Sequence, residues 1–481
     1  MNVLPELIFN KSKKGKTGIS FSFNSFENNT IAVDKKNRRD DLGDFPSLSE
    51  VETVRHYSNL ARLNHSVDHG FYPLGSCTMK YNPKINEAVA NIEKLSAHPY
   101  SPNDLVQGNL EIIKTLEKYL MELTGMDAYT LTPAAGAHGE FAGMMVIRKF
   151  LSSRGNPRKI VLIPDSAHGT NPASAHFAGY EIREIESNKE GIIDPEILKK
   201  HLNEDVAALM MTNPNTLGIF EKNIKEISDI IHENGSLLYM DGANMNAFMG
   251  IVRPGDLGVD VIHLNLHKTF STPHGGGGPG SGPIGVSNEL KEFLPVPVIS
   301  EKDSMYHVNY FSKDGIGRIK NFYGNFLVLV RALAYLKSLG HENIRKVAED
   351  AVLNANYLRK KLEPLLNLPF KSKTLHEVVF SDEGLKVKTL DIAKRLLDYN
   401  IHPFTVYFPL IIHGAMMIEP TETESKETLD EFINAMKEIL KESEENPDFI
   451  TNSPYKTPVS RLDEVYAARN LILRWEKGEQ N

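Results

Sequence analysis

Apolar residues follow two patterns along the first two thirds of the chain. Short unbroken apolar runs, bounded by polar and glycine-containing segments, are typical of strands buried on both faces of a parallel sheet. Such runs predict strands at Ile160–Ile163, Ala207–Met211, Leu237–Met240 and Val261–Leu266. Apolar residues spaced three or four apart predict helices at Gln107–Thr124, Pro195–Leu202 and Ile224–Asn234. This alternation predicts an α/β sheet with helices on both faces.

The last third of the chain carries a different pattern. Ile319–Leu339 is apolar on nearly every face and ends at Gly340, which predicts a long buried helix linking two domains. Strand-like segments at His376–Phe380 and Thr405–Ile411 then alternate with helical ones at Glu342–Leu366, Thr389–Tyr399 and Ser425–Lys441. We therefore expect a large parallel-sheet domain at 66–330 and a smaller C-terminal α+β domain at 331–481. Residues 1–65 sustain no period and are expected to form an N-terminal arm.

Composition excludes several classes of protein. The chain has 481 residues, is 41% hydrophobic and carries a formal net charge of −8. That apolar content can form packed cores, and a mildly acidic chain lacks the basic patch of a nucleic-acid binder. No apolar run is long enough for a membrane span, and no signal peptide is evident. The single cysteine, Cys77, cannot form an internal disulfide or supply a multi-thiolate zinc site. A cytoplasmic globular protein without a metal site is expected.

Lys268 is the first candidate catalytic residue. It follows an apolar strand and precedes a glycine run at 275–278. Burial lowers the pKa of a lysine, and a neutral amine can form a Schiff base with a carbonyl, as in pyridoxal phosphate enzymes. A surface lysine beside a flexible loop is the alternative. The glycines also match a dinucleotide-binding spacing, but Pro279 and Pro283 stand where that motif needs a helix.

Three further candidates each follow an apolar segment. Asp241, at the end of a buried strand, could pair with a pyridinium N–H, or could cap a helix. Gly136 and Ala137 open an apolar helix whose N-terminus favours a phosphate, or form a plain tight turn. His168 could stack on an aromatic cofactor ring, or be a structural histidine. Their joint order, phosphate turn, histidine, aspartate and lysine, indicates a pyridoxal phosphate site.

The segments around these residues resemble a known family. His263–Val286 and the string Phe71–Pro83 (FYPLGSCTMKYNP) look like the P-protein of the glycine cleavage system, glycine dehydrogenase (decarboxylating). Further matches are Pro133–Glu140, Ser166–Ala175, Gly317–Asn325 and Glu419–Ser425. The length resembles the second subunit of the two-subunit form. The resemblance implies the pyridoxal-phosphate-dependent aspartate-aminotransferase-like fold (fold type I).

The resemblance also implies roles for individual residues. Lys268 would form the internal aldimine, Asp241 would contact the pyridine nitrogen, and His168 would stack on the ring. Gly136 and Ala137 would hold the phosphate through their backbone. Thr216 and Asn244 are weaker correspondences that would contact the ring or support the pocket.

The implied activity is glycine decarboxylation with transfer of an aminomethyl group to the lipoyl arm of the H-protein, and Phe71–Lys80 would form part of the arm's channel. Implied partners are the first P-protein subunit in an α2β2 heterotetramer, the H-protein, the aminomethyltransferase (T-protein) and dihydrolipoyl dehydrogenase (L-protein). Two other hypotheses stay open. One is another pyridoxal phosphate enzyme, such as a serine hydroxymethyltransferase or a decarboxylase acting alone. The other is a non-catalytic subunit, which the intact Lys268 and Asp241 argue against.

Overall fold

The computed structural model describes residues 4–18, 34–39 and 41–475. The chain divides into two compact units, one formed by residues 1–70 with 454–481 and the other by residues 71–453. The expected domain boundaries at 65/66 and 330/331 stay a prediction. Among the helices that the structure describes, none combines the length and the apolar content that a membrane crossing requires.

The larger unit is built on a seven-stranded sheet with the order β1-β7-β6-β5-β4-β2-β3. Its strands are β1 (Ala128–Thr130), β2 (Ile160–Pro164), β3 (Glu181–Ile185), β4 (Val206–Thr212), β5 (Leu237–Asp241), β6 (Val261–His263) and β7 (Ile284–Val286). Strands β3, β2, β4, β5 and β6 pair in parallel, whereas β7 runs antiparallel to both β6 and β1. The expected parallel sheet is therefore a mixed one, because a single strand is reversed near one edge.

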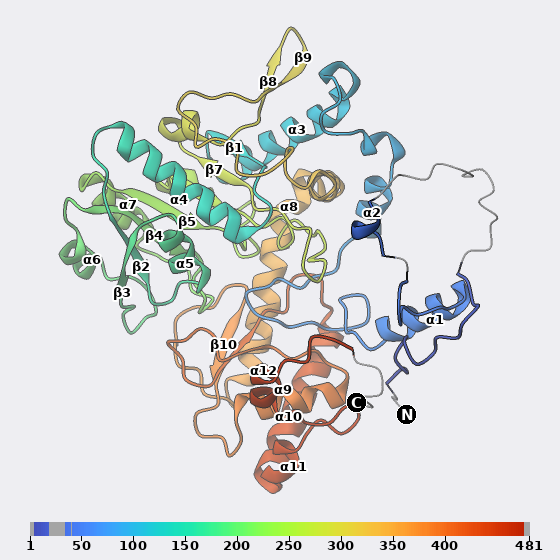
Figure 1. The fold of residues 1–481 in the computed structure, drawn as a ribbon. Coiled ribbons are helices and arrows are strands. Elements are labelled where there is room, and N and C mark those ends of the chain that lie inside the picture. Colours follow the sequence, from blue (N-terminus) through green and yellow to red (C-terminus); the bar gives the residue numbers. More distant parts are fainter. Residues whose placement is uncertain (1–3, 19–33, 40, 476–481) are drawn as a thin grey trace. The chain divides into compact units, whose positions relative to one another are not determined.

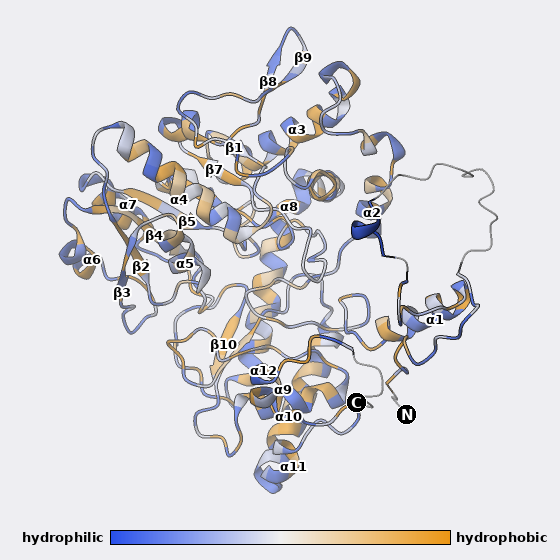
Figure 2. Cartoon of the chain, viewed as in Figure 1, coloured by the Kyte–Doolittle hydropathy of each residue, from blue (hydrophilic) through white to orange (hydrophobic). Residues whose placement is uncertain are grey.

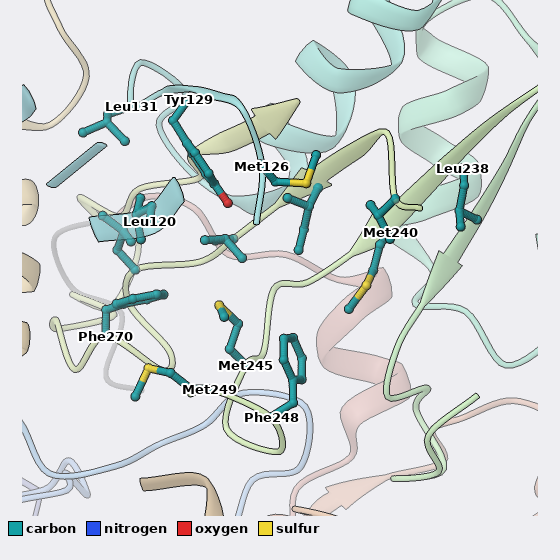
Figure 3. Packing of buried hydrophobic residues seen from close by; sticks show 14 of the residues in the cluster. Leu120, Met126, Tyr129, Leu131, Leu238, Met240, Met245, Phe248, Met249 and Phe270 are labelled. Carbon is teal, nitrogen blue, oxygen red and sulfur yellow. The ribbon is translucent and has the colours of Figure 1, made fainter. Parts of the chain in front are cut away.

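Alternate residues of each strand enter two different cores, because successive side chains point to opposite faces of a sheet. In β5, Leu238 and Met240 belong to one core, while Leu237 and Tyr239 belong to the other. Figure 3 shows part of the first core, where Met240 lies near Phe248 and Met245. Both faces are therefore covered, as the unbroken apolar runs predict.

Helices from different parts of the chain cover the two faces of the sheet. The first core includes residues of α3 (Gln107–Thr124), α6 (Pro195–His201), α7 (Ile224–Glu233) and α8 (Phe326–Leu362). The second includes residues of α4 (Gly136–Ser153) and α5 (Thr170–Phe177). In Figure 2, α4 alternates between orange and blue along its length, as expected for a helix with one face on a sheet. The predicted layers, helices on both faces of the sheet, are thus confirmed.

Helix α8 leads from the large sheet to a second, smaller sheet (Figure 1). Gly340 interrupts it with a φ of 64°, a conformation that favours glycine, so the helix end expected at Gly340 is a kink within one long element. The smaller sheet has the antiparallel order β10-β12-β11, with strands β10 (Val378–Ser381), β11 (Thr405–Val406) and β12 (Ala415–Ile418). Helices α9 (Thr389–Leu396), α10 (Lys426–Glu445) and α11 (Pro447–Thr451) pack with it around a separate apolar core.

Several element boundaries differ from the expected ones. The strand expected at Thr405–Ile411 spans only Thr405–Val406, because Pro409 cannot donate to a strand ladder. The strand expected to reach Leu266 ends at His263, where the chain turns toward Lys268. The apolar segment from Ile319 becomes helical only at Phe326. The basic stretch Arg461–Trp475 contains one short helix, α12 (Glu464–Arg469).

The remaining described elements are short. They are helices α1 (Glu50–Ala61) and α2 (Lys84–Ala90), the hairpin β8 (Val298–Lys302) with β9 (Met305–Asn309), and 3-10 helices at Lys35–Asn37, Glu93–Ser96, Asn103–Leu105, Pro254–Leu257, Asn288–Phe293 and Leu397–Tyr399. In the smaller unit, Ser49 caps α1, and its side chain and that of Glu52 satisfy each other's backbone N–H groups. Residues 1–3, 19–33 and 40 of the expected arm lie outside the described residues.

Candidate active site

The residues that were predicted to form the site line one cavity of about 160 Å³. It lies beyond the carboxyl ends of β4 and β5, where sheets of this kind present ligand-binding groups. All the candidate residues from the sequence line it: Gly136, Ala137, His168, Thr216, Asp241, Asn244 and Lys268. Residues that lie far apart along the chain therefore share one site, as the motif order predicts.

Lys268 reaches this cavity from a turn five residues beyond β6. Its backbone N–H donates to the Asn265 carbonyl, and its own carbonyl accepts from Ser271. The next residue, Thr269, is fully buried, and its hydroxyl accepts the N–H of Met245 at 2.8 Å. Lys268 itself is half-buried rather than fully buried. The turn is thus held by buried contacts, while the lysine side chain stays available to the cavity.

Asp241 ends β5 and is only 3% exposed. Its oxygens accept from the Ala243 N–H and the Asn171 side-chain amide, both at 2.9 Å, and His263 Nε2 lies 3.2 Å away. Burial alone would raise the pKa of this carboxyl, but His263 and the two donors outweigh it and hold the pKa below its ordinary value. Turns, not a helix, follow Asp241, so the helix-cap alternative is wrong.

The N-terminus of α4 faces the same cavity with its first turn. Gly136 is the first residue of this 18-residue helix, and no side chain caps its first turn. The backbone N–H groups of such a turn have no partner within the helix, and the helix dipole favours negative charge there. A Cβ on Gly136 would lie 2.6 Å from the Asn265 Oδ1. The close packing of the start of α4 against Asn265 therefore requires glycine at position 136.

The neighbouring Asn265 supplies a polar atom without a partner. Its Oδ1 is buried and makes no hydrogen bond among the described residues, and Asn265 lines the cavity. A buried acceptor of this kind is costly unless a bound group satisfies it. A phosphate dianion has no hydrogen to donate to this acceptor, so the uncapped helix end and the close approach at Gly136 are the features that fit a phosphate-bearing cofactor.

His168 is held in the cavity by a chain of hydrogen bonds. Its Nδ1 lies 2.8 Å from the Thr170 hydroxyl, which donates to Glu140 at 2.8 Å. Burial lowers the pKa of the imidazole below its ordinary value, so the ring is neutral at neutral pH. A neutral planar ring is suited to lie against an aromatic cofactor.

Thr216 and Asn244 both make hydrogen bonds within the protein. The Thr216 hydroxyl donates to the Ser166 carbonyl at 2.7 Å, and the Asn244 amide donates to Glu419 at 2.7 Å. The Thr216 bond uses the only side-chain donor of that residue, so the geometry favours pocket support over direct contact for Thr216. Asn244 supports the pocket through Glu419 and has a second amide N–H.

The cavity also contains residues that sequence reasoning missed: Glu140, Asn265, His376 and Glu377. Glu377 directly precedes β10, and Glu419 directly follows β12. The register pairs Val378 with Ile418, so the two glutamates become neighbours across the antiparallel ladder. That register is not encoded in either segment alone. The one signal in the sequence is the position of a glutamate beside an apolar strand.

The segment Phe71–Lys80, expected to form part of a channel wall, reaches the site at two points. Ser76 lines the cavity. Lys80 is buried and donates to the Thr269 carbonyl at 2.6 Å, to Glu422 at 2.6 Å and to the Tyr335 hydroxyl at 3.1 Å. Burial opposes the charge of Lys80, but Glu422 and Tyr335 outweigh it and raise the pKa of the ammonium. The first of these bonds holds the backbone carbonyl of the residue next to Lys268.

We expect the substitution Lys80→Met to destabilise the protein strongly. It would leave the Glu422 carboxylate buried without its cation, which costs about 3–5 kcal/mol in free energy of unfolding. The thermal midpoint of unfolding checks this. Lys426→Met, which removes an exposed ion pair with Asp430, is the matched control and should shift the midpoint little. Equal shifts for the two variants would contradict the structural role of Lys80.

The chain is similar to known proteins over most of its length. The family model described as glycine cleavage system P-protein matches residues 14–307, and the model described as glycine dehydrogenase, C-terminal domain, matches residues 347–454. A probable glycine dehydrogenase (decarboxylating) subunit 2 of Caldanaerobacter subterraneus is 54% identical over 98% of this chain and 99% of its own length. One from Kosmotoga olearia is 53% identical over 98% of this chain and 100% of its own length.

Solved structures share the fold. Glycine decarboxylase (P-protein) of the glycine cleavage system, in an inhibitor-bound form, superposes with a TM-score of 0.70 at 21% identity, covering 84% of this chain and 93% of that one. An alanine–glyoxylate aminotransferase from Nostoc superposes with a TM-score of 0.56 at 17% identity, covering 77% and 95%. The expected aspartate-aminotransferase-like fold is confirmed.

Proposed function

The chain belongs to the P-protein family of the glycine cleavage system, the glycine dehydrogenases (decarboxylating), and we propose that it decarboxylates glycine at the cavity around Lys268 with bound pyridoxal phosphate. The aminomethyl group that remains passes to the lipoyl arm of the H-protein. The observation that carries this proposal is the meeting of Lys268, Asp241 and the N-terminus of α4 in one cavity.

Four groups of the chain would hold the cofactor. Lys268 Nζ is the amine that would bind its aldehyde covalently. The backbone N–H groups of Gly136 and Ala137 would bind its phosphate, and Asp241 would bind its ring nitrogen. When bound, pyridoxal phosphate supplies an electron sink for the electron pair that the departing carboxyl group leaves on carbon.

Asp241 keeps a negative charge in the cavity throughout the neutral range. Because its pKa lies below the ordinary value, the carboxylate stays ionised at pH 7 and favours a proton on the facing ring nitrogen. His263 and Asn171 fix the orientation of the carboxylate. The Asp241 side chain would thus hold the proton that makes the ring electron-withdrawing.

The other side chains orient the reactants and limit water. His168, neutral and oriented through Thr170, would lie against the cofactor ring. The small volume of the cavity suits glycine, which offers no side chain for binding, so orientation must come from contacts to its carboxylate and amine. Thr216 and Asn244 would hold the walls through their bonds to Ser166 and Glu419.

The proposed partners follow from the family. The relatives are named subunit 2, and we propose that this chain works with a first P-protein subunit in an α2β2 assembly. The lipoylated H-protein would receive the aminomethyl group, and the T-protein and L-protein would act on it afterwards. A cytoplasmic location also stays a prediction.

We expect the isolated chain to be inactive and the assembly to be active. Pockets of such folds are often completed by a second subunit, which excludes water from the reaction. The measurement is exchange of labelled bicarbonate into glycine with lipoylated H-protein, using the chain with and without the first subunit. Exchange that appears only on addition of the first subunit, with both chains co-eluting, supports the proposal. Equal exchange by the isolated chain would contradict the requirement for a partner.

A further inference from the structure

Two buried carboxyl groups lie side by side next to Lys268. One oxygen of Glu377, one oxygen of Glu419 and one ring nitrogen of His376 lie within 4.8 Å of one another. The exposed fractions of the two glutamates are 3% and 0%. Two carboxylates this close in a dry environment cannot both stay ionised, so the pair shares a proton near neutral pH.

The hydrogen bonds decide which glutamate carries that proton. Glu419 accepts three bonds, from the Thr78 N–H at 2.9 Å, the Thr78 hydroxyl at 2.7 Å and the Asn244 amide at 2.7 Å. Glu377 accepts a bond from the Ser76 N–H at 2.9 Å. Burial raises the pKa of both carboxyls, but three donors oppose this at Glu419 and only one at Glu377, so Glu419 ionises first and Glu377 is the acid.

The remaining titratable groups around Glu377 agree with this assignment. His376 Nε2 lies 3.9 Å from Glu377 Oε1, and burial lowers the pKa of His376 to about 3, so it brings no positive charge. Burial raises the pKa of the nearby Cys77 thiol, which is therefore neutral. Lys268 favours ionisation of Glu377, but burial and the charge of Glu419 outweigh it and leave the Glu377 pKa well above the ordinary value.

The proposed reaction needs an acid within reach of the lipoyl disulfide. Breaking the carbon–carboxyl bond of glycine releases carbon dioxide and leaves an electron pair on carbon. That pair forms a bond to one lipoyl sulfur, the disulfide breaks, and the second sulfur leaves as a thiolate. The disulfide is reduced, the glycine carbon is oxidised, and one proton is required to complete the product as a thiol.

We propose that Glu377, which lines the cavity beside Lys268, is the catalytic acid that donates this proton to the departing lipoyl sulfur. The inference rests on the proposed function, because it requires a lipoyl disulfide as acceptor. Glu377 becomes a carboxylate in the step and recovers a proton from solvent before the next turnover. Glu419 keeps its charge and holds the proton on its neighbour.

The protonation of Glu377 can be measured without turnover. Infrared difference spectra of the full-length chain should show a protonated-carboxyl band at pH 7 that the variant Glu377→Gln lacks. In Glu419→Gln the same band should titrate at lower pH, because the neighbouring negative charge is gone. No band lost in Glu377→Gln would overturn the inference.

The second test follows aminomethylation of lipoylated H-protein by the assembly of both subunits. Glu377→Gln retains shape and the acceptor for Ser76 but cannot give up a proton, so the rate should fall by about 10²–10⁴-fold. Covalent fixation of cofactor by borohydride should remain, and Glu377→Asp should recover part of the rate. A transfer rate for Glu377→Gln within about threefold of wild type would overturn the inference.

A matched control separates this acid from other buried carboxyls. Burial also raises the pKa of Glu117, but it pairs with Lys114 on α3 and does not line the cavity. Glu117→Gln should keep the protonated-carboxyl band of Glu377 and transfer at the wild-type rate. If wild type and Glu117→Gln both fail to aminomethylate the carrier, the proposed function is wrong and the inference falls with it. If both succeed and Glu377→Gln succeeds equally, only the inference is wrong.

Discussion

Lys268→Ala abolishes covalent retention of pyridoxal phosphate and reduces glycine decarboxylation to background: this is the largest effect that we expect. Without the amine at the end of the 265–268 turn, no group in the cavity can bind the aldehyde of the cofactor. Borohydride reduction followed by peptide mass spectrometry checks this, because the wild-type chain should carry the cofactor at Lys268. The variant should carry none.

The variant should also fold normally, since Lys268 is half-buried and its backbone bonds are retained. Lys199→Ala, an exposed lysine on α6 paired with Glu196, is the matched control and should keep the reducible cofactor. Fixation of the cofactor at a different lysine in Lys268→Ala would show that the assignment is wrong.

Asp241→Asn should keep the cofactor but lose most of the decarboxylation rate. The amide cannot balance a protonated ring nitrogen, and losing one partner of a buried ion pair costs about 3–5 kcal/mol. If that cost falls on the transition state, the rate drops by about two to four orders of magnitude. The rate of carbon dioxide release by the assembled enzyme, measured with saturating glycine, tests this.

The pH profile adds a second check on Asp241. Its pKa in the folded protein is lowered, so its contribution is present above the ordinary value of about 3.9 and is lost only as pH falls through the lower folded value. No loss of rate due to Asp241 is therefore expected between about pH 5 and 7. Asp229→Asn, on the exposed side of α7, is the control that should change neither rate nor profile. An undiminished rate in Asp241→Asn would contradict the assigned role.

The sheet could be predicted from the sequence because its central strands are buried on both faces. Unbroken apolar runs such as Leu237–Met240 have few other structural solutions, and their polar successors then fall at one edge of the sheet. For that reason the apolar pattern alone places Asp241 and His168 at the same edge. The order of the motifs along the chain then indicates that the phosphate turn and Lys268 belong to the same site.

Features set by long-range register could not be predicted. The edge strand Glu181–Ile185 is mostly exposed and polar, so it lacks an apolar signal. Strand β7 has only three residues, too few to reveal that it runs antiparallel. Glu377 and Glu419 meet only because β10 and β12 pair in one register. Lys80 finds Glu422 and Tyr335 through tertiary packing that no local pattern encodes.

We propose that this cavity splits glycine and transfers its methylene carbon to a lipoyl carrier. The most direct measurement incubates the assembly of both subunits and lipoylated H-protein with glycine labelled at the carboxyl carbon or, separately, at the methylene carbon. Carboxyl label should leave entirely as carbon dioxide, and methylene label should appear on the carrier as an aminomethyl adduct, one per reduced disulfide. Carboxyl label retained in the product, or carbon dioxide released without any adduct on the carrier, would contradict the account.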